Sequence, residues 1–289
     1  MSVVIVNRDA REALLQCLGS IKRFPPAVAW EAIVVDNNSS DGSVTATAGD
    51  FPETRVIANA DNRGLARANN QGMAAARGEV VLISNPDVVF TAGALDALWS
   101  AMQRHPRAAF IVPRLVHPDG SLQTSAGDLP RLREALLGRG ANRQAAAARA
   151  DTAAGFWWDG WAHDEERRIG HGAEACYLVR RAAMAEIGPQ DERFFLDWEG
   201  VEWSARAQRH GWEVWFTPTA EVVHVGGTSI KQAQLRWVVW SHQGLYRYFR
   251  AQSPALLRPP LAALISLRAG VKIASLVAGQ PLYDRANRG

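Results

Sequence analysis

Three short polar segments of the sequence carry residue types that can bind a nucleotide and a metal ion. They are Asp36–Gly42, Asp61–Gly64 and Ser84–Asp87, and each comes shortly after a run of apolar residues. Carboxylate oxygens are ligands that Mg²⁺ and Mn²⁺ prefer, and these ions commonly add substrate phosphates to their shell. Each segment alone also suits an ordinary turn. Three such segments in succession favour one shared binding site.

The third segment has the most specific pattern, Asn85-Pro86-Asp87. Pro86 has no amide hydrogen and a fixed φ, so it ends the preceding strand and holds Asp87 just beyond it. Asp87 is therefore the candidate metal ligand among these segments.

A second group of candidate catalytic residues lies in the other half of the chain. Asp197, Glu199 and Glu202 are three carboxylates at a point where a helix is expected to begin. Acidic residues are common there because they interact favourably with the helix dipole. A carboxylate can also serve as a general base, so both interpretations apply to this segment.

These residues need elements that bring them together, and the first 112 residues predict such elements. The predicted strands are 3–6, 32–35, 55–58, 80–83 and 109–112, and the predicted helices are 10–22, 41–48, 65–77 and 92–104. This alternation predicts an α/β fold, with a parallel sheet covered by helices on both faces. Ligands of such sheets bind outside the carboxyl ends of the strands. The three polar segments lie at those ends.

The rest of the chain is less uniform. Residues 113–170 are irregular, with a helix-prone stretch at 144–148, and the periodic pattern resumes from 173 to 215. The tail from 232 predicts two helices separated by Ser253-Pro254. Its apolar residues are interrupted by basic ones, so we expect no spanning helix. Such a segment either lies in a membrane interface or packs on a second subunit or on the chain's own domain.

Composition limits the classes of function. The chain has 289 residues, with 32 basic against 29 acidic side chains and a net charge of +3. This balance is too even to indicate nucleic acid, but it suits an anionic ligand or a loosely bound anionic membrane. Two cysteines give no disulfide framework, and the strand-like N-terminus has no secretory signal. We therefore expect a cytoplasmic location.

The polar motifs and their order resemble glycosyltransferase family 2, particularly its bacterial rhamnosyltransferase-like members. The matching segments are Val-Val-Ile-Val-Asn, Val-Val-Asp-Asn-Asn-Ser-Ser-Asp-Gly-Ser, Asn-Arg-Gly-Leu-Ala-Arg-Ala-Asn-Asn and Ser-Asn-Pro-Asp-Val, within a resemblance over residues 2–250. The resemblance implies a GT-A fold, which is a Rossmann-like, mostly parallel sheet flanked by helices, here with a C-terminal helical extension. It implies inverting, metal-assisted transfer of a sugar from a nucleoside-diphosphate donor to a hydroxyl group of a glycan or glycolipid.

The resemblance also implies roles for the donor-side residues. Asp36 is expected to contact the nucleotide base, and Asn62 and Gly64 to form the wall around the nucleotide and donor sugar. Asn85 and Asp87 stand where the family has its Asp-x-Asp motif. An amide is a poorer cation ligand than a carboxylate, so Asp87 is expected to hold the metal and Asn85 a ribose hydroxyl.

His224 is expected to complete the metal shell, because a histidine at this place commonly does so in the family. The cofactor is then Mn²⁺ or Mg²⁺. The following residues Gly226–Ser229 resemble a loop that closes over the diphosphate. The donor is expected to be a dTDP-sugar, rhamnose first, or a UDP-sugar, and the acceptor a glycan or a lipid-linked glycan.

The catalytic base is where the sequence departs from the family. The aspartate usually assigned as base aligns with Gly200. Glu199 is the favoured replacement, because it is adjacent and one methylene longer, and Asp197 is the second candidate. Otherwise the protein is a catalytically impaired relative that binds nucleotide sugars. In relatives the segment Gly172–Cys176 forms the floor of the acceptor site. Here its residue types indicate only a stretch of small residues that leads into a strand.

The expected organisation is a GT-A domain over residues 1–231 and a helical extension over 232–289. Within the domain, residues 1–112 form the nucleotide-binding half and 113–231 the acceptor half. A nucleotidyltransferase would share the sheet, but it needs a basic glycine-rich loop that residues 6–9 do not supply. The C-terminal helices are candidates for a homodimer contact. Trp157, Trp158 and Trp161 are expected either to stack on acceptor sugars or to pack in the core.

Overall fold

The structure, a computed structural model, describes residues 1–137, 155–226 and 234–279. Within these ranges the centre is a sheet of ten strands. Its main path runs through β3 (Arg55–Ala58), β2 (Glu31–Asp36), β1 (Ser2–Asn7), β4 (Val80–Ser84), β11 (Cys176–Arg180), β6 (Ala108–Val116), β12 (Glu213–His224) and β5 (Val88–Phe90). Two short strands join it, β7 (Leu122–Gln123) on β6 and β9 (Arg167–Ile169) on β12. A separate ladder pairs β8 (Ala126–Gly127) with β10 (His171–Gly172).

The first four strands of this path are parallel, and β1, β2 and β4 are buried on both faces, whereas the edge strand β3 is partly exposed. Alternate side chains of a strand point to opposite faces. Val3 and Ile5 of β1 therefore pack in one apolar cluster and Val4 and Val6 in another. The first cluster includes side chains of α1 (Arg11–Arg23) and α4 (Ala94–Arg104), and the second those of α3 (Leu65–Ala75), α7 (Arg181–Ile187) and α8 (Glu199–Arg209). Helix α2 (Ser43–Asp50) packs beside α1 and β3. The predicted strands and helices of this half are confirmed within a few residues at each end.

The other half of the sheet is mixed in direction. Strand β11 runs antiparallel between β4 and β6, whereas β12 runs parallel to β6. The end of β12 then pairs antiparallel with β5, so that His224 lies opposite Val88. The predicted mostly parallel sheet with helices on both faces is confirmed. Its antiparallel pairs bring distant parts of the chain to the carboxyl edge of β4.

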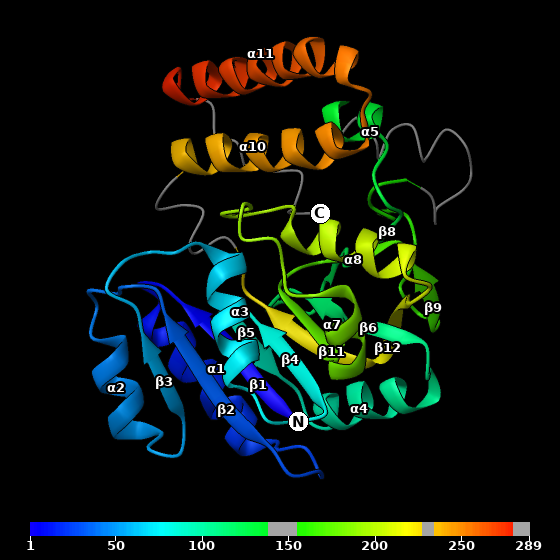
Figure 1. The fold of residues 1–289 in the computed structure, drawn as a ribbon. Helices are drawn as coiled ribbons and strands as arrows, with labels where there is room; N and C mark the ends of the chain where they lie inside the picture. The colour runs from blue at the N-terminus through cyan, green and yellow to red at the C-terminus, as the bar shows by residue number, and fades with distance from the viewer. Residues whose placement is uncertain (138–154, 227–233, 280–289) are drawn as a thin grey trace.

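Two helices follow the sheet domain, as the tail pattern predicts. They are α10 (Gln234–Gln252) and α11 (Arg258–Val277), joined through a short 3₁₀ turn, η1 (Ala255–Leu257). Figure 1 shows them stacked over one side of the molecule, with α5 (Leu132–Leu137) beside them. Leu245 and Phe249 of α10 share an apolar cluster with Trp198 and Val201, which lie at the start of α8. The extension therefore packs on the segment that carries the acidic residues.

Two of the three tryptophans of the irregular region, Trp158 and Trp161, belong to the core, whereas Trp157 is only partly buried. Trp158 and Trp161 are only 4% and 7% exposed. Their rings meet edge to face, and Trp161 also packs on Phe216, with ring centroids 4.9 Å apart. Packing, rather than sugar stacking, therefore explains these two residues. The helix-prone stretch 144–148 lies outside the described residues.

Candidate active site

Asp36 ends β2 inside a network of hydrogen bonds. Its carboxylate is 2% exposed and accepts hydrogen bonds from the Asn7 amide at 2.9 Å and from the Ser39 hydroxyl and backbone N–H at 2.6 and 2.8 Å. These bonds hold the carboxylate rigidly at the edge of the sheet. The buried Oδ1 of Asn7 has no partner among the described residues. A ligand that donates a hydrogen bond beside Asp36 would satisfy this acceptor. Asn7 was not among the predicted site residues.

Gly64 joins the donor side of the sheet to the acidic segment. Its N–H donates to Asn62 Oδ1 at 3.0 Å, and its carbonyl accepts from Asn37 Nδ2 at 3.2 Å. The next amide, of Leu65, donates to the Phe195 carbonyl at 2.7 Å. Gly64 has φ +81° and ψ 170°, a conformation that is essentially restricted to glycine. Asn62 and Gly64 thus form one wall of the candidate site, next to Phe195.

Asp87 and His224 meet across the β5–β12 pair. His224 Nε2 lies 3.4 Å from Asp87 Oδ1, and both side chains are nearly buried. Burial would raise the pKa of Asp87, but the His224 side chain and nearby backbone amides outweigh it, so the pKa is lowered. Asp87 is therefore a carboxylate at neutral pH. The backbone N–H of Asn85 donates to the Ala175 carbonyl at 2.8 Å, which ties this turn to the start of β11.

The donor set of Asp87 and His224 fits a divalent cation. Gln123 Oε1 lies 2.8 Å from His224 Nδ1, so Nδ1 is the ring nitrogen that carries the hydrogen. With a cation bound beside Asp87, Nε2 would offer its lone pair to the metal, as in histidines that bind metals. The described residues contain no group of three or more acidic, histidine or cysteine side chains in metal-binding arrangement. A cation here would take its remaining ligands from phosphate oxygens or water. Gln123, at the end of β7, was not among the predicted site residues.

The acidic residues cluster in front of α8. Asp197 and Trp198 have φ of +68° and +74°, and this left-handed turn starts the helix. Glu199 is fully buried, and neither of its carboxyl oxygens accepts a hydrogen bond from an N–H or O–H group of the described residues. The group that faces Glu199 is the carboxyl of Glu174. Burial raises the pKa of both Glu174 and Glu199, and the carboxyl of Glu174 raises the pKa of Glu199 further. Glu174 is a third residue, after Asn7 and Gln123, that was not predicted.

Asp197 faces the C-terminal helices. Burial raises its pKa to about 6, and Ser241 and Trp237 of α10 and Lys272 of α11 offset part of that rise. Burial also lowers the pKa of Lys272 to about 8. Asp197 and Glu199 are thus two positions apart in the sequence but have different neighbours. The loop 226–229, apart from Gly226, lies outside the described residues.

Comparisons with known proteins agree with this geometry. The model of the family "Glycosyl transferase family 2" matches residues 2–158. An N-acetylglucosaminyl-diphospho-decaprenol L-rhamnosyltransferase of Mycobacterium tuberculosis is 30% identical over 253 residues, which cover 79% of this chain and 77% of that protein. The mannosyltransferase PcManGT from Pyrobaculum calidifontis, solved with GDP-Man and Mn²⁺, matches 97% of this chain and 76% of its own, with a TM-score of 0.56 and 17% identity. GalNAc-T7, solved with UDP, GalNAc and Mn²⁺, matches 77% of this chain but 43% of its own, with a TM-score of 0.57 and 17% identity. The two solved structures share the fold.

Proposed function

The chain belongs to glycosyltransferase family 2, and we propose that it transfers a deoxyhexose such as rhamnose from a nucleoside-diphosphate donor to a hydroxyl group of a lipid-linked glycan. The observation that carries this proposal is the convergence of three groups at one sheet edge. They are the network around Asp36, the pair of Asp87 and His224, and the acidic cluster before α8. A nucleotide, a cation and an acceptor hydroxyl need these three kinds of group. The rhamnosyltransferase relative supports the choice of sugar and lipid.

In this proposal residues 1–112 bind the donor and 113–231 the acceptor. Asp36 accepts a hydrogen bond from the imide N–H of thymine or uracil. Asn62 and Gly64 line the nucleotide and donor sugar, and Asn85 binds a ribose hydroxyl. The rigid bonds from Asn7 and Ser39 hold the Asp36 carboxylate in one orientation, which reduces the entropy lost on binding.

Asp87 and His224 would hold the metal ion, Mn²⁺ or Mg²⁺, with Gln123 fixing the imidazole. When bound, this ion would neutralise the charge that develops on the departing diphosphate. The Mn²⁺ of the two solved neighbours supports the presence of a divalent metal ion. The acceptor hydroxyl loses its proton to a carboxylate of the acidic cluster, for which the sequence nominates Glu199 and Asp197.

A binding and transfer experiment tests this function. We expect dTDP or UDP with Mn²⁺ to raise the melting temperature, because a ligand that binds only the native state stabilises it by mass action. We also expect transfer from dTDP-rhamnose or a UDP-sugar to an N-acetylglucosaminyl-diphospho-polyprenol. Replacing Asp36 with alanine should weaken dTDP or UDP binding about tenfold or more, since a hydrogen bond to a charged group contributes roughly 1.5–3 kcal/mol.

Three outcomes of this experiment are informative. Equal nucleotide affinities of the Asp36→Ala variant and the unmodified protein would remove Asp36 from the site. Nucleotide-sugar binding without transfer to any acceptor would favour the second candidate function, a binding relative that has lost catalysis with the aspartate missing at Gly200. No binding of any nucleoside diphosphate would overturn the proposal as a whole.

We also place the enzyme at the cytoplasmic side of a membrane, held there peripherally by α11. Residues Ala255–Val277 are the one stretch in the described ranges long and apolar enough to cross a membrane by length and composition, a property the sequence analysis did not expect. Its charges face the protein, since Arg268 donates to the Leu136 carbonyl at 2.8 Å and Lys272 lies over the Trp237 ring. The opposite face is apolar and exposed, with Leu256, Leu264, Leu267 and Val271 between 46% and 87% exposed. A helix with its charges on one face and exposed apolar side chains on the other is suited to lie in a membrane interface.

Vesicle sedimentation tests this placement. The triple change Leu256→Gln, Leu267→Gln and Val271→Gln should lower binding to anionic vesicles about tenfold or more, because each side chain loses on the order of 1 kcal/mol of transfer free energy. The change Leu235→Gln, on α10, is the exposed control. If the unmodified protein does not bind vesicles at low salt and forms a dimer that the triple change disrupts, this face binds a second subunit instead.

A further inference from the structure

We infer that Glu174 is the general base of the transfer and that its carboxylate occupies the space left free by Gly200. This inference rests on the proposed function and names the residue that performs its central step. The acceptor hydroxyl gives its proton to Glu174, and its oxygen bonds to the anomeric carbon of the donor sugar. The bond from that carbon to the diphosphate breaks, and its electron pair leaves with the diphosphate.

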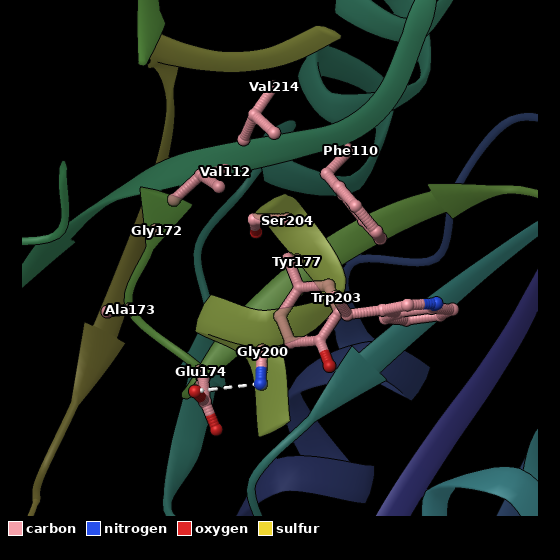
Figure 2. A pocket seen from close by; sticks show the side chains of 10 residues that line it. All are labelled: Phe110, Val112, Gly172, Ala173, Glu174, Tyr177, Gly200, Trp203, Ser204 and Val214. Atoms are coloured by element: carbon pink, nitrogen blue, oxygen red, sulfur yellow. Dashed lines mark hydrogen bonds between the residues drawn. The ribbon is translucent and has the colours of Figure 1, made fainter. Parts of the chain in front are cut away.

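The contact between the two residues is direct. Glu174 Oε1 accepts a hydrogen bond from the Gly200 N–H at 2.9 Å, as Figure 2 shows. A Cβ atom added to Gly200 would lie 2.6 Å from Cγ, 2.7 Å from Cδ and 2.8 Å from Oε1 of Glu174. Real Cβ atoms do not approach other atoms so closely, so a side chain at position 200 and the Glu174 carboxylate exclude each other. The carboxylate stands where a side chain of residue 200 would begin.

Glu174 also lies beside the donor-side residues. It precedes β11, whose Cys176 pairs with Ser84 of β4. The Asn85 N–H continues this ladder to the Ala175 carbonyl. Glu174 is therefore level with the turn that carries Asp87, on the neighbouring strand. A base at this point faces the same sheet edge as the proposed metal ligands.

Accessibility separates Glu174 from Glu199. Glu199 is 0% exposed, whereas Glu174 is partly exposed. The cavity behind Glu174 and Gly200 has a volume of ≈ 10 Å³, which is about the size of one water molecule. An acceptor cannot enter there, so it must approach from the open side of Glu174. Glu199 is fully buried and faces the Glu174 carboxyl, and we assign it as a positioning residue.

The surroundings also make Glu174 a stronger base. The titratable groups that act on it or face it are Glu199, Asp197 and Tyr177. Burial and the negative charge of Asp197 raise the pKa of Glu174, while the side chain of Glu199 and the amides of Gly200 and Val201 lower it in part. The net pKa is higher than that of an exposed glutamate. A base whose pKa is near the working pH is deprotonated in a large fraction of the molecules and still has a high affinity for the proton.

Glu174 also caps α8, and this purely structural role predicts different results. In the Glu174→Gln variant the amide oxygen can still accept the Gly200 N–H, so the cap is kept and only the basic oxygen is lost. We expect the melting temperature and Mn²⁺-dependent dTDP or UDP affinity to stay unchanged, while kcat falls about 10²–10⁴-fold. Glu186→Gln, whose carboxylate accepts from Trp212 on another surface, is the matched control. Full activity in Glu174→Gln, with losses of both stability and activity in Glu174→Ala, would leave the cap as the only role.

Exchanging the two residues provides a second test. Gly200→Asp alone should impair folding or activity, because its Cβ meets Glu174. The combined variant Glu174→Gly with Gly200→Asp has room for a carboxylate from α8, and we expect at least about ten times the activity of Glu174→Gly alone. A folded combined variant that is no more active than Glu174→Gly counts against the inference.

The pH profile of kcat/KM is a third test, and it concerns the role of Glu199. The acid limb of kcat/KM reports the protonation of the base in the free enzyme. The hydrogen bond from the Glu199 side chain lowers the pKa of Glu174. Glu199→Ala removes this bond, so we expect the limb to move to higher pH by about one unit. An unmoved limb would show that Glu199 does not act on the base. These results are separate from the proposed function, which fails if the unmodified protein transfers no sugar.

Discussion

Replacing Asp87 with alanine is expected to abolish metal-dependent binding of nucleoside diphosphates. Asp87 is 7% exposed, and among the described residues it is the carboxylate paired with His224. Changing even a residue that orients a metal ligand costs about 10–100-fold in metal affinity. Removing the charged ligand itself should therefore cost roughly 10²-fold or more. His224→Ala should weaken binding less, because a neutral imidazole carries no charge to balance the cation.

The measurement is titration calorimetry of dTDP or UDP with and without Mn²⁺. Gln123→Ala should fall between the unmodified protein and His224→Ala, since it only frees the imidazole that Gln123 holds at 2.8 Å. Asp50→Ala, an exposed aspartate at the end of α2, is the control for a changed net charge. If a chelator leaves both nucleotide binding and transfer unchanged, Asp87 and His224 do not form a metal site.

Replacing Gly64 with alanine is expected to cost roughly 3 kcal/mol or more of folding free energy, because two penalties of about 1–3 kcal/mol each combine. The first is the backbone conformation, φ +81° and ψ 170°, which residues with a Cβ rarely adopt. The second is contact, since a Cβ would lie 2.7 Å from the Phe195 carbonyl oxygen and 2.8 Å from its ring. The clash would push the Asn62–Gly64 wall away from the acidic segment. Donor binding should therefore fall with stability.

Gly93 provides a control with one of these penalties only. It has φ +78°, but a Cβ there would meet nothing within 4 Å. We expect Gly93→Ala to cost about 1–2 kcal/mol, the usual penalty for a left-handed residue with a side chain. Thermal unfolding measures both variants, and the difference corresponds to several degrees in melting temperature. Equal losses would mean that the contact with Phe195 adds nothing.

Much of the fold was evident from the sequence alone. The strands and helices of the first 112 residues lie where the apolar periodicity predicts them, and so do the two helices after 232. The placement of Asp36, Asn62 and Asp87 at the carboxyl edge also follows from the order of the elements. These features depend on residues that are close together in sequence. Local patterns of polarity and turn residues therefore suffice to predict them.

The partners within the site were decided by the tertiary structure. Glu174 looked like part of a small-residue approach to a strand, and only the insertion of β11 between β4 and β6 brings it against Gly200. His224 meets Asp87 because the end of β12 turns onto β5. The burial of Glu199 depends on the left-handed turn at Asp197 and Trp198 and on the packing of α10 over it. Periodicity determines which face of an element is apolar, but strand order determines which distant side chains meet. Gly200 and Glu174, whose carboxylate fills the space beside it, are 26 residues apart in the sequence. No local sequence pattern therefore links them.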